Sequence, residues 1–96
     1  MKIQILEDAE KDLINGYGFC KHQLPGLDIY FFESLFSGIE SLKLYAGIHA
    51  KHFGYHRFLS KRFPYAVYYR MKQATVHVYA VLDCRQNPIK IQKRLT

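Results

Sequence analysis

The side chains of this chain that are best suited to chemistry are basic and aromatic, and they are concentrated in its second half. Residues 49–96 hold ten Lys/Arg and one Asp, a net charge of +9, whereas residues 1–48 hold four Lys/Arg and seven Asp/Glu, a net charge of −3. A net charge of +6 can simply aid solubility, but this clustering favours an anionic partner, either nucleic acid or an acidic protein.

The basic cluster is interleaved with tyrosines along predicted strands. It consists of Lys51, His52, His56, Arg57, Lys61, Arg62, Arg70, Arg85, Lys90, Lys93 and Arg94. Neighbouring strands lie about 4.8 Å apart, so basic groups on one sheet face can converge on a phosphate backbone. Tyr68, Tyr69 and Tyr79 can stack on bases, or they can be core and rim residues. In an enzyme this set would suit RNA cleavage, because a basic side chain can help deprotonate the 2′-OH and arginine can stabilise charge on the pentacoordinate phosphate.

Other reaction types find little support in the sequence. His49, His52 and His56 have an H-x2-H-x3-H spacing, but Gly54 interrupts a helix through them and no cysteine or acid lies nearby to complete a zinc site. We therefore expect a basic loop there and no metal. The serines have no evident His/Asp partner, and the glycines form neither a P-loop nor a dinucleotide fingerprint, so no cofactor is expected.

The first half of the chain predicts a pair of antiparallel helices. Acidic residues near the start of the chain favour a helix N-terminus, and apolar residues at helical spacing then predict a first helix over about residues 8–22. Gly16 and Gly18 weaken the middle of this helix. Leu24-Pro25-Gly26 breaks the chain. An apolar stripe then predicts a long amphipathic helix over about residues 27–46. Its members are Leu27, Phe31, Leu35, Ile39, Leu42 and Ala46.

The second half changes to an alternating pattern that predicts three antiparallel strands, over residues 55–60, 63–72 and 75–83. A further short strand is expected over residues 2–6, and a polar tail from Pro88 predicts one or two turns of helix. In the last strand the alternation places one set of side chains on one face and the rest on the other. The first set is Val76, Val78, Ala80 and Leu82, and the second is His77, Tyr79 and Val81.

These elements predict one α+β domain over residues 1–96, in the order β-α-α-β-β-β, with an N-terminal helical hairpin packed on a small, mainly antiparallel sheet. No apolar run reaches the about 20 residues that a membrane helix needs, and no signal peptide is evident. We therefore expect a cytoplasmic protein with no membrane partner. Cys20 and Cys84 lie in different segments, and both are expected to be reduced and buried.

At these residues the chain resembles the RelE/ParE superfamily of type II toxin–antitoxin toxins. The resemblance covers nearly the whole chain and rests on the strand order, Ile39–Leu42 and three motifs. These are GYHRFL at 54–59, KRFPYAVYY at 61–69 and VYAVLDCRQNP at 78–88. The combination of an FPYxxxY strand with a following strand that ends near R-x-N-P is the most specific part.

The resemblance implies the RelE/ParE toxin fold and a small cytoplasmic bacterial toxin, of the kind linked to plasmid stabilization and growth inhibition. A cognate antitoxin would neutralise it by wrapping it with an extended or helical segment. RelE-like members cleave mRNA in the ribosomal A site, and ParE-like members inhibit DNA gyrase. In the RelE-like case the catalytic candidates are Arg57, Arg85, His56 and Lys61. Two expected groups are absent, because Ala66 and Ile91 occupy the places of an arginine and a C-terminal tyrosine.

The long helical hairpin, the FPYxxxY strand and these absences favour the ParE-like alternative, a binding function that needs no catalytic residue. The partners would then be the antitoxin and DNA gyrase; in the RelE-like alternative they would be the ribosome and mRNA. A non-toxic nucleic-acid-binding module of the same fold is a third possibility. The expected functional basic surface is Arg57, Lys61, Arg62, Arg70 and Arg85. The expected antitoxin contacts are Phe31, Phe32 and Phe36, as exposed aromatic residues.

Overall fold

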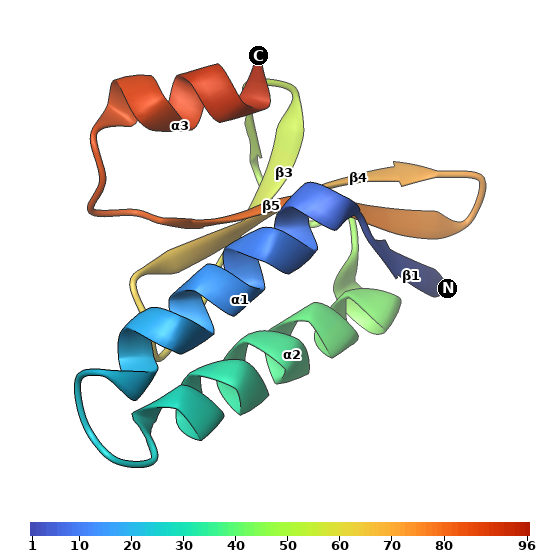
Figure 1. Cartoon of the computed structure of the whole chain (residues 1–96). Coiled ribbons are helices and arrows are strands. Elements are labelled where there is room, and N and C mark those ends of the chain that lie inside the picture. Colours follow the sequence, from blue (N-terminus) through green and yellow to red (C-terminus); the bar gives the residue numbers. More distant parts are fainter.

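The computed structural model describes all 96 residues, as a five-stranded sheet with helices on both of its faces (Figure 1). The elements are β1 (Lys2–Ile5), α1 (Glu7–Lys21), α2 (Leu27–Tyr45), β2 (Lys51–His52), β3 (Tyr55–Leu59), β4 (Tyr65–Lys72), β5 (Thr75–Asp83) and α3 (Pro88–Leu95). The strand order is β1-β5-β4-β3-β2. Only β1 pairs in parallel, with β5, and the other neighbours are antiparallel. The predicted α+β class and element order are confirmed.

The helical hairpin lies along one face of the sheet, and Figure 1 shows α1 and α2 side by side. Acidic residues occupy the first turn of α1, where they favour the helix dipole, and Gly26 precedes α2 with a φ of 82°. Gly16 does not interrupt α1. A Cβ on Gly16 would lie 2.4 Å from Cζ of Phe31, so this glycine lets the two helices approach closely.

Two apolar clusters flank the sheet. The larger one lies between the sheet and the α1–α2 hairpin, and it contains Ala9, Leu13, Cys20, Phe31, Leu35, Ile39, Leu42, Val67, Tyr69, Val76, Val78 and Val81. The smaller one lies under α3 and contains Ala66, Tyr68, Ala80, Leu82 and Leu95. The predicted α2 stripe is therefore the main core contact of the hairpin, while α3 covers part of the opposite face.

The predicted alternation of β5 is wrong beyond Val78. Tyr69 pairs with Val78 but Tyr68 pairs with Ala80, so Tyr79 is the extra residue of a β-bulge. A bulge exchanges the faces of all residues that follow it, which strict alternation cannot anticipate. The bulge therefore places Val81 in the larger cluster with Val76 and Val78, and Ala80 and Leu82 in the smaller cluster on the opposite face.

The remaining differences from the sequence-based prediction concern ends and short segments. The strand β4 begins at Tyr65 rather than at residue 63, and the expected basic loop contains the two-residue strand β2. The tail helix α3 is present. Both cysteines are free; Cys20 is buried, but Cys84 is only half-buried, contrary to the prediction. No helix in the structure has the length and apolar character needed to cross a membrane.

Candidate functional site

Basic and aromatic side chains gather on the sheet face opposite the α1–α2 hairpin. We call this surface the open face and define it by Tyr55, Arg57, Tyr68, Arg70 and Tyr79. Its members come from β3, β4 and β5, and cross-strand pairing places Arg57 directly opposite Tyr68. The helix α3 covers one part of this side of the sheet and buries Tyr68, whereas Tyr55, Arg57 and Tyr79 are half-buried and Arg70 is exposed.

The guanidinium of Arg70 lies over two tyrosines of the open face. Its guanidinium carbon lies 3.9 Å from the ring centre of Tyr55 and 5.6 Å from that of Tyr79, and the two rings are 5.0 Å apart. The Nε of Arg70 donates a hydrogen bond to the backbone carbonyl of Gly54 at 3.2 Å. Because only Nε is engaged and the residue is exposed, the terminal nitrogens remain free to bind an anionic group.

Arg57 supplies the second cation of the open face. The residue is half-buried, its Nε is buried without a hydrogen-bond partner, and its Nη1 lies 3.4 Å from Nε2 of His52. An unpaired buried donor is uncommon in native structures, and because this Nε is inaccessible, an anionic partner would reach Arg57 through its terminal nitrogens. Burial raises the pKa of the neighbouring Tyr68, although the positive charge of Arg57 opposes this effect. Tyr68 is therefore a neutral phenol at physiological pH.

His56, which was expected beside Arg57, lies on the other side of the sheet together with His49, whereas His52 contacts Arg57. His56 stacks on Tyr69, with ring centres 5.1 Å apart, and its Nδ1 lies 2.6 Å from the carbonyl oxygen of His49. His49 in turn contacts the hydroxyl of Tyr69 through Nδ1 at 2.5 Å. Burial, and secondarily the charge of His56, lowers the pKa of His49. These imidazoles anchor the segment before β2 to the core, and no group of His, Cys, Asp or Glu forms a metal site.

Arg85 lies in a third place, after the end of β5. Its Nε and Nη2 donate to the Asp83 carboxylate at 3.1 and 2.9 Å. This contact lowers the pKa of Asp83 and raises that of Arg85. Arg85 is exposed, so the pair is accessible to a partner but already neutralised.

Lys61 and Arg62 occupy the β3–β4 turn, where they face α2. Arg62 donates to the hydroxyl of Tyr30 at 2.7 Å. The five basic residues expected to form one surface are thus divided among three places. Arg57 and Arg70 share the open face, whereas Lys61 and Arg62 lie on the α2 side of the sheet.

Comparison with known proteins bears on the fold. No protein-family model matches the chain, and no curated protein matches its sequence. Among solved structures, a chain described as "Chromosomal ParDE TA system from P. aeruginosa" superimposes with a TM-score of 0.76, covering 84% of this chain and 92% of that chain at 16% sequence identity. The fold is that of the ParDE chain. The fold expected from the sequence resemblance is thereby confirmed.

On this fold the three expected aromatic contacts have different environments. Phe31 is fully buried, with ring centres 5.1 and 5.0 Å from Phe63 and Tyr65, so its predicted exposure is wrong. Phe32 is 44% exposed, and its ring lies 4.3 Å from that of the half-buried Phe36. Phe31 belongs to the apolar stripe of α2, which already predicted a core position.

Phe32 and Phe36 line an apolar groove of about 710 Å³ between the outer surfaces of α1 and α2, which we call the hairpin groove. Its lining residues are Glu10, Leu13, Ile14, Tyr17, Ile29, Phe32, Glu33 and Phe36. Sequence reasoning missed Ile14 and Ile29, which are 67% and 56% exposed. The available signal was their position: both are large apolar residues that lie off the buried stripe of their helix.

Proposed function

We propose that this chain is the toxin of a type II toxin–antitoxin pair and that it inhibits growth by binding DNA gyrase. The observation that carries the proposal is the fold, which it shares with a chain of a ParDE toxin–antitoxin system over most of both chains. The sequence resemblance to ParE-like toxins, over nearly the whole chain, independently supports the same assignment.

The placement of the basic residues supports binding over cleavage. The candidate base His56 lies on the opposite side of the sheet from Arg57, because successive side chains of a strand alternate in direction. Lys61 lies in the β3–β4 turn, and Arg85 is paired with Asp83. General acid–base catalysis needs a proton acceptor within hydrogen-bond reach of the reacting group. Of the candidates His56, Lys61 and Arg85, none thus lies beside Arg57 on the open face, and the one imidazole near Arg57 is that of His52, 3.4 Å from its Nη1.

The hairpin groove is the best candidate for the antitoxin contact. It is mainly apolar and formed by side chains of α1 and α2, and its lining includes the two acids Glu10 and Glu33. A groove between helices suits the apolar side of an amphipathic segment, and the two carboxylates would favour basic residues flanking that side. Such a segment would cover Ile14, Ile29 and Phe32, which are otherwise exposed.

A gyrase assay tests the proposed toxin activity. Induced expression should arrest growth, and the purified chain should inhibit DNA supercoiling by gyrase. Arg57→Gln should weaken that inhibition by about 10- to 30-fold if Arg57 is a central contact. Truncating a side chain at the centre of an interface costs about 2 kcal/mol of binding free energy. The matched control is Lys21→Gln, which removes one positive charge from the exposed end of α1. Equal loss in both variants would show that only net charge matters.

A ribosome-dependent mRNA endonuclease is the second candidate function, and the packing of Arg70 over the rings of Tyr55 and Tyr79 favours it. Aromatic rings with a stacked guanidinium are a common platform for unpaired bases. A translating ribosome system with primer-extension readout separates the two candidates. Cuts at defined codon positions with gyrase unaffected would overturn the gyrase proposal. No effect in either system and no growth arrest would leave a non-toxic binding module.

A further inference from the structure

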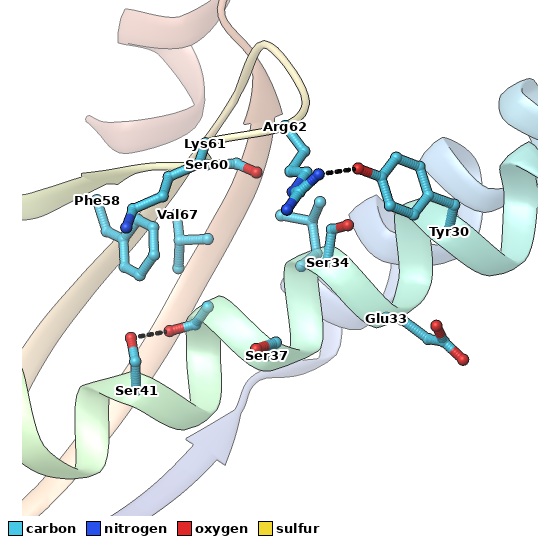
Figure 2. A pocket seen from close by; sticks show the side chains of 12 residues that line it. Tyr30, Glu33, Ser34, Ser37, Ser41, Phe58, Ser60, Lys61, Arg62 and Val67 are labelled. Carbon is cyan, nitrogen blue, oxygen red and sulfur yellow. Dashed lines mark hydrogen bonds between the residues drawn. The ribbon is translucent and has the colours of Figure 1, made fainter.

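A cavity of about 460 Å³, lined mainly by polar residues, lies between α2 and the β3–β4 turn (Figure 2). It is on the other side of the sheet from the open face and shares only Glu33 with the lining of the hairpin groove. We call it the serine pocket and define it by Tyr30, Ser34, Ser37, Ser60, Lys61 and Arg62. Figure 2 shows the serines of α2 facing Ser60, Lys61 and Arg62 across the pocket. The volume is in the range of small-molecule sites.

Two cations border the serine pocket without a carboxylate partner. None of the four salt bridges in the structure includes Lys61 or Arg62, and the single side-chain hydrogen bond of Arg62 goes to the Tyr30 hydroxyl. One acid, Glu33, belongs to the lining, but its carboxylate points away from the cations (Figure 2). The border of the pocket at the β3–β4 turn therefore carries a local positive charge.

Three hydroxyl groups complete the donor set. Ser34 and Ser37 lie three residues apart on one side of α2, and Ser60 follows the end of β3. None of these hydroxyls makes a hydrogen bond within the protein, whereas the neighbouring Ser41 donates to the carbonyl of Gly38. Free hydroxyls beside two cations form a donor-rich site that suits a ligand with several acceptor oxygens.

One end of the pocket, beside Lys61, is apolar (Figure 2). Phe58 packs against α2 at Gly38, where an added Cβ would lie 2.9 Å from Cζ of Phe58. With Tyr30 at the other end, the pocket has two aromatic side chains at its borders. Such borders can contact the carbon atoms of an organic ligand while its charged end faces the serines.

We infer that the serine pocket binds a small organic phosphate monoester of about mononucleotide size. A phosphate monoester carries about −1.5 to −2 charges at pH 7 and three acceptor oxygens, which matches two cations and three hydroxyl donors. The binding site is separate from the surfaces assigned to gyrase and antitoxin, so the inference goes beyond the proposed function and does not depend on it.

Binding is tested by calorimetry and amide NMR on the full chain, with AMP, ribose 5-phosphate, inorganic phosphate and adenosine as probes. AMP and ribose 5-phosphate should shift the amide signals of Ser34, Ser37 and Ser60, and adenosine should bind at least about tenfold more weakly. No saturable binding of AMP below about 10 mM would overturn the inference. So would equal affinity for adenosine, or binding of inorganic phosphate alone.

Matched variants locate the site. Arg62→Gln should weaken AMP binding by at least about tenfold, because it removes a charged donor, and Ser37→Ala should weaken it about fivefold. Lys72→Gln removes the same charge at the opposite end of β4 from the pocket and should change affinity by less than about twofold. Equal losses in Arg62→Gln and Lys72→Gln would mean a general charge effect and overturn the assignment. Circular dichroism checks that each variant is folded, and the NMR shifts of the unmodified chain test the site without any substitution.

Discussion

Replacing Asp12 with alanine should destabilise the protein by about 2–4 kcal/mol, because this one carboxylate connects α1 to both β5 and α3. Its Oδ2 accepts a hydrogen bond from the backbone N–H of Val81 at 3.0 Å. Both oxygens also accept from the guanidinium of Arg94, at 2.7 and 2.8 Å. β1 pairs only with residues 75–78 of β5, so the Val81 N–H has no strand partner on that edge.

The two contacts contribute unequally to this estimate. Val81 is 2% exposed, and leaving its N–H unpaired costs about 1–3 kcal/mol. The Asp12–Arg94 ion pair is bidentate, but the Arg94 side chain is 36% exposed, so solvent screening limits it to about 1 kcal/mol. The pair raises the pKa of Arg94, chiefly through its hydrogen bond to Asp12, which agrees with a favourable contact.

Urea unfolding followed by circular dichroism measures both contributions in a double-mutant cycle of Asp12→Ala and Arg94→Gln. We expect Arg94→Gln to cost about 1 kcal/mol and the coupling energy to be about 1 kcal/mol. Asp12→Asn, which keeps an acceptor for the Val81 N–H, should cost less than Asp12→Ala. If Arg94→Gln costs as much as Asp12→Ala, the bond to Val81 contributes nothing. A loss below about 0.5 kcal/mol for Asp12→Ala would refute the reasoning altogether.

Three further predictions concern stability. Gly16→Ala should lower the free energy of unfolding by about 1–3 kcal/mol, because the added Cβ would overlap Phe31. The control is Gly18→Ala, whose added Cβ would have no atom within 4 Å and should be neutral or stabilising. Urea unfolding measures both variants. The pKa of His49 is lowered in the folded state, so the unfolded chain binds the proton more readily. The free energy of unfolding should therefore fall as the pH drops below about 6.5. In urea titrations at pH 7.5 and 5.5, His49→Gln should reduce the difference in free energy of unfolding between the two pH values. Asn87→Ala should lower the midpoint of thermal unfolding, with a loss of about 1 kcal/mol in the free energy of unfolding, because the Asn87 side chain accepts a hydrogen bond from the Ile89 N–H at the start of α3. An unchanged midpoint would mean that α3 does not contribute to global stability.

Elements with a strong local period were predictable from sequence. The stripe of α2 recurs at helical spacing, and each of Phe31, Leu35, Ile39 and Leu42 is buried as that period requires. The strand β5 shows the limit of this reasoning. Its extent was predicted correctly, but the bulge at Tyr79 depends on its pairing with β4, which no local pattern encodes.

Phe31 shows how two sequence signals can compete. Its place in the apolar stripe predicted burial, while its place among several aromatic residues suggested an exposed partner contact. The structure decides for burial because Gly16, on the facing helix, leaves space for the Phe31 ring. Only the approach of α1 to α2 brings these two residues together, so neither helix alone indicates the outcome.

By itself, the sequence determined the α+β class, the order and approximate bounds of the long elements, and the concentration of positive charge in the second half. These properties follow from spacing and composition along one segment at a time. The tertiary structure alone decided that Arg57 and Arg70 share the open face, that His56 lies behind the sheet, and that Lys61 and Arg62 border a pocket with the serines of α2. The physical reason is that a period fixes which side chains of an element point together, whereas strand register and helix packing decide what they meet.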